Sequence, residues 1–235
     1  MYTFESRIRQ SEADRNELLK YSGIVDYFQD CAIFQTNDLG VGNRFLHDEL
    51  KTAWVLSTWN IKIVRRPAIG EKILTGTAPY ELKGFFGKRN FRMSTPEGEI
   101  LSVADSLWTM LDLRTGKPCR VPEEVVNAYT PEEKLPMEYI RSRIEIPDGL
   151  REMEKITVTE HYIDSNLHMN NSRYVETAAD CAEMEDIKRI RVEYHRQARR
   201  GDILIPLRGE TEKGCVIVIA DPEGERICVA EFLRA

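Results

Sequence analysis

The sequence predicts an α+β fold built from two tandem copies of one unit, each a long helix followed by an antiparallel sheet. Three segments of the first half recur in the same order in the second half. The pairs are 8–32 with 158–182, 61–74 with 192–205, and 96–107 with 222–233. The last pair is identical at seven of its twelve positions. A duplication of this kind implies two packing units rather than a solenoid, because only two copies are present.

The first element of each copy is predicted to be a helix with one apolar face. Apolar side chains at positions 24, 28, 31 and 32 have the spacing of one helix face, and positions 174, 178, 181 and 182 repeat it. The second copy is shorter, mainly because it lacks a counterpart to part of residues 33–58.

Strands are expected after each helix. In copy 1 the β-rich runs are 54–64, 72–78, 88–94 and 101–113, separated by Gly and Pro turns. The proline-rich segment 115–150 is expected to be a linker with a short helix over 123–128. The domains are therefore predicted as 1–114, the linker 115–150, and 151–235. An antiparallel sheet wrapped around a central helix is the hot-dog arrangement, so we expect a tandem double hot dog.

The composition narrows the class of protein. The chain has 235 residues, of which 42% are hydrophobic and 31% charged, and it lacks the ~18-residue apolar run of a membrane span. Its first residues resemble neither a signal nor a transit peptide, so we expect a cytoplasmic protein. A net charge of -6 disfavours nucleic acid as a partner. The five cysteines lack a CxxC pair, which argues for free thiols rather than disulfides or zinc.

The densest polar segment, residues 162–171, lies directly before the second helix. Asp, Asn and Ser residues in this place are most often helix caps or turn residues. The segment also contains His168, whereas copy 1 has Leu18 at the aligned position and keeps Asp14 and Asn16. Copy 2 thus has a titratable histidine in this segment, whereas copy 1 has only the flanking Asp and Asn residues. The sequence pattern is compatible with both a capping role and a catalytic role.

Hydrolysis of a thioester needs an activated water and hydrogen-bond donors for the carbonyl oxygen as it becomes an anion. His168 suits the first task, since an imidazole can take up a proton near neutral pH. Asn166 can hold a water or a carbonyl through its amide, and Asp164 can orient its neighbours. Free N–H groups at the helix start near Asn171 are expected to form an oxyanion site.

The segment D-S-N-L-H-M-N-N-S-R-Y, residues 164–174, resembles the D-x-N-x-H-x-N-N-x-x-Y motif of the acyl-acyl carrier protein thioesterases of plants and bacteria. Other stretches are similar to that family along almost the whole chain: 54–63, 87–91, 98–110, 122–125 and 192–198. The resemblance implies hydrolysis of fatty acyl thioesters, with Asp164, Asn166 and His168 as catalytic residues.

The resemblance also implies a tunnel for the acyl chain in the first hot dog. Ile24, Phe28 and Trp54 are candidates for its lining, although an aromatic residue in a sheet is more often plain core. The basic pair Lys88 and Arg89 is expected to contact the substrate. The acidic acyl carrier protein would suit such basic residues as a partner.

The chain departs from the family on one strand. Plant members read E-Y-x-x-E-C there, with the second Glu assigned to the site as a water-activating base and the Cys once proposed as nucleophile. This chain has Gln197 and Ala198, which excludes a Cys/His mechanism at that position. We prefer His168 as the base, with Asn166 and Gln197 positioning the water or the carbonyl and Asp164 orienting the network.

Three further side chains are lesser candidates for a catalytic role. Glu176 and Asp180 on the helix are lesser candidates for a replacement carboxylate, and a capping or solvated role suits them better. Cys181 is expected to be a small core residue rather than a nucleophile.

Three functions are compatible with the sequence: hydrolysis of acyl-acyl carrier protein, hydrolysis of acyl-coenzyme A, and non-catalytic sensing of acyl thioesters. The Asp164, Asn166 and His168 set favours an enzyme over a sensor. No metal and no organic cofactor are implied, since the candidate side chains do not have the sequence spacing of metal ligands and thioester hydrolysis requires neither group. A monomer or a homodimer is compatible with the duplication.

Overall fold

The computed structural model describes residues 1–234. The chain forms two compact units. Unit 1 comprises Met1–Leu19, Asp26–Ser57 and Val64–Tyr139, and unit 2 comprises Lys20–Val25, Thr58–Ile63 and Ile140–Ala235. In the described part of the chain, no helix is long and apolar enough to cross a membrane.

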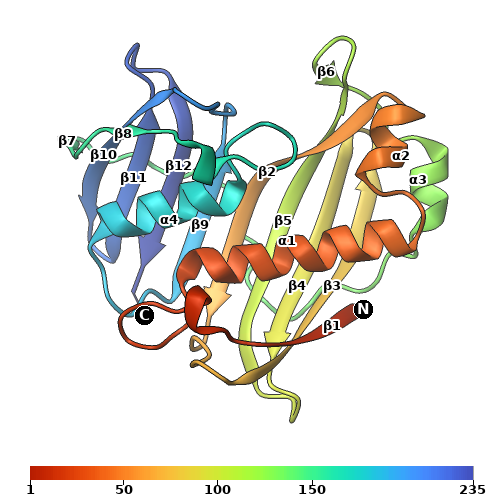
Figure 1. Cartoon of the computed structure of the whole chain (residues 1–235), viewed down its shortest axis with the longest axis horizontal. Helices are drawn as coiled ribbons and strands as arrows, with labels where there is room; N and C mark the ends of the chain where they lie inside the picture. The colour runs from red at the N-terminus through yellow and green to blue at the C-terminus, as the bar shows by residue number, and fades with distance from the viewer. Residues whose placement is uncertain (235) are drawn as a thin grey trace. The chain divides into compact units, whose positions relative to one another are not determined.

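Unit 1 is an antiparallel sheet with a long helix, α1 (Tyr21–Asp38), across one face (Figure 1). Its strands pair in the order β1-β3-β4-β5-β2, and β6 pairs with β5. Their bounds are β1 (Tyr2–Arg7), β2 (Thr52–Ile63), β3 (Lys72–Lys83), β4 (Phe86–Ser94), β5 (Ile100–Asp112) and β6 (Lys117–Pro118). The short helices are η1 (Gln10–Glu12), α2 (Asn43–Asp48) and α3 (Glu123–Ala128).

The predicted apolar face of α1 packs on this sheet. The Cys31 Sγ lies 3.5 Å from the carbonyl oxygen of Thr75 in β3. The ring of Phe28 is 5.2 Å from that of Phe91 in β4, measured between centroids. The side chains whose spacing predicted a helix are thus the ones that bury against the strands.

Unit 2 repeats the arrangement around the shorter helix α4 (Asn171–Ala182), which contacts β10, β11 and β12. Its strands pair in the order β9-β12-β11-β10-β7, β8 pairs with β10, and residues 58–62 of β2 pair with β9. Their bounds are β7 (Arg151–Glu152), β8 (Ile156–Thr157), β9 (Arg189–Tyr194), β10 (Ile203–Thr211), β11 (Gly214–Ala220) and β12 (Arg226–Leu233). A short helix, η2 (Glu160–Tyr162), precedes α4.

Matching hydrogen bonds confirm the duplication. Leu19 N donates to Pro67 O at 2.8 Å, and the equivalent Met169 N donates to Ala198 O at 2.9 Å. The longer first copy is also explained: α1 has 18 residues against 12 in α4, and α2 follows it. The two halves therefore have the hot-dog arrangement, each with its own central helix.

The segment predicted to be a linker contains the expected helix, α3, and its remainder packs onto the sheets. Asn90 Oδ1 in β4 accepts hydrogen bonds from Leu135 N at 3.1 Å and from the Tyr139 hydroxyl at 2.8 Å. Glu193 Oε1 in β9 accepts one from Ile144 N at 2.8 Å. Buried polar groups need partners, and here the irregular backbone supplies them.

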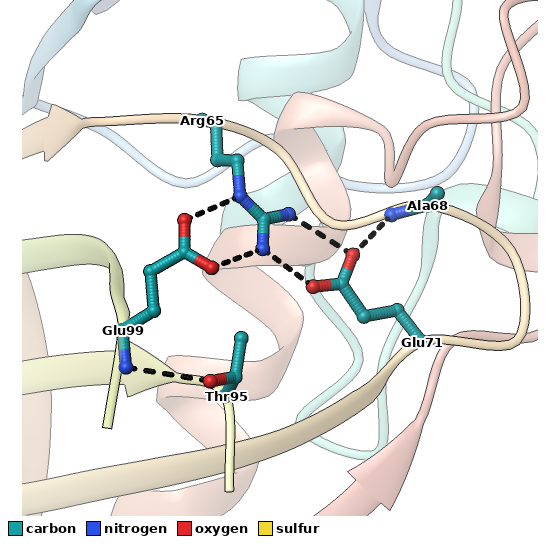
Figure 2. A network of polar contacts seen from close by, with 5 residues as sticks. All are labelled: Arg65, Ala68, Glu71, Thr95 and Glu99. Carbon is teal, nitrogen blue, oxygen red and sulfur yellow. Dashed lines mark hydrogen bonds and ion pairs between the residues drawn. The ribbon is translucent and has the colours of Figure 1, made fainter. Parts of the chain in front are cut away.

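An arginine joins three turns of unit 1 (Figure 2). The Arg65 guanidinium donates to both carboxylate oxygens of Glu71, at 3.0 and 2.7 Å, and to both of Glu99, at 2.7 and 2.6 Å. Glu71 Oε2 also accepts from Ala68 N at 2.9 Å. The cluster ties the ends of β2, β3 and β5 together.

Candidate active site

The polar segment before α4 forms a tight turn. Asp164 N donates to His168 O at 2.9 Å, and Leu167 N donates to Asp164 O at 3.0 Å. The Asp164 carboxylate accepts a hydrogen bond from Asn166 N at 2.8 Å, which is an Asx turn. Leu167 has φ 64°, the left-handed conformation that closes the turn. Asp164 and His168 are half-buried beside this turn, while Asn166 is exposed.

Asn170 is the N-cap of α4. Its side-chain oxygen accepts from Ser172 N at 2.9 Å and from the Ser172 hydroxyl at 3.1 Å, so one predicted oxyanion donor is already in use. Arg173 N donates to Asn170 O at 2.9 Å. Of the capping and catalytic interpretations of this segment, capping is therefore correct for Asn170, while the catalytic role of residues 164–168 stays a prediction.

Two tyrosines hold the strand end that carries Gln197 beside this turn. Ala198 N donates to the Tyr174 hydroxyl at 2.7 Å, and the Tyr194 hydroxyl donates to Asn171 O at 3.0 Å. Ala198 O accepts from Met169 N at 2.9 Å. Gln197 is exposed and directly precedes Ala198 in the chain. Ala198 in turn is hydrogen-bonded to Met169, which follows His168.

Tyr174 is buried in the core of unit 2. Burial raises the pKa of its phenol, and the hydrogen bond from Ala198 N partly opposes this rise. Sequence reasoning missed the positioning roles of Tyr174 and Tyr194, although Tyr174 ends the motif segment.

The equivalent turn of copy 1 has an arginine at the position that aligns with Gln197. Arg66 aligns with Gln197, and its Nη1 donates to Asp14 Oδ2 at 2.6 Å. Burial alone would raise the pKa of Asp14, but the Arg66 guanidinium and two backbone N–H groups outweigh burial and lower it. The backbone of the two turns matches, since Asp14 N donates to Leu18 O at 2.8 Å and Asn16 N to Asp14 Oδ1 at 2.8 Å. The alignment of residues 61–74 with residues 192–205 already places Arg66 at the position of Gln197.

The lesser candidates have other surroundings. Glu176 pairs with Arg173 at 2.6 Å and with Lys20 at 3.4 Å. Partial burial and the charge of Glu176 raise the pKa of Asp180. Cys181 is buried, as its place in the core predicts, and burial raises the pKa of its thiol away from the reactive thiolate form. Within residues 1–234, no cluster of three or more His, Cys, Asp or Glu side chains could hold a metal ion.

Unit 1 contains a cavity with about 520 Å³ of empty space, part of it open to solvent. Its walls come from α1, α2, β2, β3, β4, β5 and the residue after α3, and they include Ile33, Trp54, Leu82, Trp108 and Tyr129. Three of the side chains expected to bind substrate, Trp54, Lys88 and Arg89, line it. Ile24 and Phe28 do not; they are 1% and 0% exposed in the core. The sequence did not single out Leu82, Trp108 or Tyr129, because only packing brings them to this wall.

Comparisons with known proteins agree along the chain. The family model described as the acyl-ACP thioesterase N-terminal domain matches residues 1–129, and the one for the C-terminal domain matches residues 147–232. A chloroplastic acyl-acyl carrier protein hydrolase of Cuphea viscosissima is 23% identical over 93% of this chain and 55% of its own length. A chloroplastic palmitoyl-acyl carrier protein thioesterase of Arabidopsis thaliana is 25% identical over 91% of this chain and 55% of its own length. The chain spans about half the length of these relatives.

Solved structures show the same fold. An acyl-ACP thioesterase from Bacteroides thetaiotaomicron has a TM-score of 0.88 at 25% identity, covering 98% of this chain and 96% of its own. A 12:0-ACP thioesterase from Umbellularia californica has a TM-score of 0.85 at 18% identity, covering 99% and 96%. Through the two domain models that match most of its length, this chain belongs to the acyl-ACP thioesterase family.

Proposed function

We propose that this protein hydrolyses the thioester of fatty acyl-acyl carrier protein, releasing a free fatty acid and the carrier thiol. The observation that carries the proposal is the turn of residues 164–168, in a chain whose two halves match the two domains of the family. A protein of this function would act in the cytoplasm, as the sequence predicts, with acyl carrier protein as its partner.

In this mechanism His168 takes a proton from a water molecule, and the oxygen of that water attacks the thioester carbonyl carbon. The tetrahedral oxyanion is held by the side-chain amide donors of Asn166 and Gln197. Asp164 accepts the Asn166 N–H at 2.8 Å and so keeps the turn in shape. The carbon–sulfur bond then breaks, and the departing thiolate takes the proton from the His168 imidazolium.

The acyl chain would occupy the cavity of unit 1, whose wall contains Trp54, Lys88 and Arg89. Its mostly apolar lining suits a hydrocarbon chain.

The test is thiol release from acyl-acyl carrier proteins of several chain lengths and from the matching acyl-coenzyme A esters. His168→Ala should lower kcat by about 100- to 10,000-fold, the usual contribution of a general base. His161→Ala is the matched control, since this exposed histidine lies before the turn, and it should leave kcat within about twofold of wild type.

Faster turnover of the coenzyme A esters would contradict acyl-acyl carrier protein as the substrate and indicate an acyl-coenzyme A thioesterase. Binding of acyl thioesters without any turnover would contradict the hydrolase and make the protein a sensor.

A further inference from the structure

The cavity of unit 1 has one buried cation in its wall. Arg89, in β4, is only 8% exposed, although its neighbours around the cavity include Trp54, Trp108 and Leu82. The other cation of the lining, Lys88, is paired with Glu81 at 2.9 Å.

The partners of Arg89 are neutral. Its Nη1 donates to Gln35 Oε1 at 2.6 Å and to Thr77 Oγ1 at 3.2 Å. Its guanidinium carbon lies 5.3 Å from the ring centroid of Tyr129. Among the residues that the structure describes, no carboxylate forms an ion pair with Arg89.

Such an arginine is unfavourable for the fold by itself. Burial lowers the pKa of Arg89, which means that burial disfavours the charged form, yet a guanidinium remains protonated in proteins. A methionine of similar length would fill the same space without desolvating a charge. A ligand that brings an acceptor for the guanidinium would offset this desolvation.

We propose that Arg89 binds an oxygen atom on the acyl chain, so that the cavity prefers acyl groups bearing a hydroxyl, keto or carboxylate oxygen over plain hydrocarbon chains. The proposal rests on the proposed function in so far as the occupant is an acyl group. The planar guanidinium fixes the position of the oxygen, while Trp54, Trp108 and Tyr129 contact the hydrocarbon on either side of it.

The first experiment compares kcat/KM for dodecanoyl-acyl carrier protein with that for a set of its hydroxylated isomers. Wild type should favour at least one hydroxylated isomer. Arg89→Met should lower the ratio of kcat/KM for that isomer to kcat/KM for the plain chain by roughly 10- to 100-fold, the effect of one hydrogen bond to a charged group. Arg92→Met is the matched control, because Arg92 lies on the same strand outside the cavity lining, and it should change neither value.

The second experiment does not need catalysis. Trp54 and Trp108 line the cavity, so their fluorescence should report binding of octan-1-ol and octane. The ratio of the two affinities should fall by roughly tenfold or more in Arg89→Met relative to wild type. This result without thioester turnover would refute the hydrolase and still support the Arg89 site.

A structural role for Arg89 predicts a different outcome. Arg89→Met would then lower the melting temperature and keep the preference for oxygen, whereas our proposal predicts an unchanged or higher melting temperature. If Arg89→Met does not fold, Arg89→Gln serves for the same two comparisons. A wild-type protein that prefers the plain chain in both experiments would overturn the proposal.

Discussion

At the residue scale, Gln197 and Arg66 occupy equivalent places beside two copies of the same turn. Arg66 contacts the Asp14 carboxylate at 2.6 Å, and copy 1 has Leu18 where copy 2 has His168. The turn of copy 1 is therefore neutralised by an arginine and has no imidazole. In copy 2 the position of Arg66 is taken by Gln197, whose neutral amide brings no charge to the turn.

The first prediction at this scale concerns Gln197→Glu in the His168→Ala background. A carboxylate at position 197 projects from the strand position that aligns with Arg66, which contacts Asp14 in copy 1, so we expect it to take over part of the base role. Thiol release should rise at least about tenfold above His168→Ala alone, since a positioned base contributes about 100-fold or more. Gln197→Ala in the same background is the control. No difference between Glu and Ala at this position would show that water is not activated from there.

At the scale of single elements, the Arg65 cluster fixes the turns that connect β2, β3 and β5 (Figure 2). The Arg65 hydrogen bonds lower the pKa of Glu71 below its ordinary value of 4.5, although partial burial opposes this. The contacts join residues that are distant along the chain. They hold the ends of these three strands together rather than stabilising any one helix.

Glu71→Gln should therefore lower the free energy of unfolding by about 1 kcal/mol near pH 7, since the pair is partly exposed. A carboxyl with a lowered folded-state pKa stabilises the fold above its unfolded pKa and loses this effect as pH falls through the folded pKa. The difference between wild type and Glu71→Gln should thus shrink below about pH 4.5. Urea denaturation across this pH range measures it, with the exposed Glu97→Gln as control. A difference that grows toward low pH would contradict the assignment.

At the scale of the whole molecule, α1 and β2 each contribute residues to both compact units. Lys20–Val25 and Thr58–Ile63 belong to unit 2, while the rest of both elements belongs to unit 1. Unfolding of one unit would therefore disrupt part of a helix and part of a strand that continue into the other unit.

We expect one cooperative thermal transition, with equal calorimetric and van't Hoff enthalpies. Ile61→Ala, in β2 and 0% exposed, should lower stability by roughly 2–5 kcal/mol and move the entire transition. The exposed neighbour Lys62→Ala should leave it unchanged. Scanning calorimetry that resolves two transitions, with only one of them shifted by Ile61→Ala, would contradict this expectation.

The sequence by itself determined the local features of this protein. Periodicity predicted the buried faces of α1 and α4, the limits of α3 matched the expected 123–128, and the aligned copies predicted the duplication. These features are readable because helix faces, caps and turns depend on residues a few positions apart. The family of the chain was recognisable for the same reason, from the short segment that forms the turn before α4.

Only the tertiary structure decided which distant side chains meet. It divided α1 and β2 between the two compact units, with Lys20–Val25 and Thr58–Ile63 in unit 2. It also buried Arg89 among Gln35, Thr77 and Tyr129, and bound the supposed linker to Asn90 and Glu193. Such contacts depend on strand register and on packing between segments far apart in the chain, and a local pattern does not specify either of these.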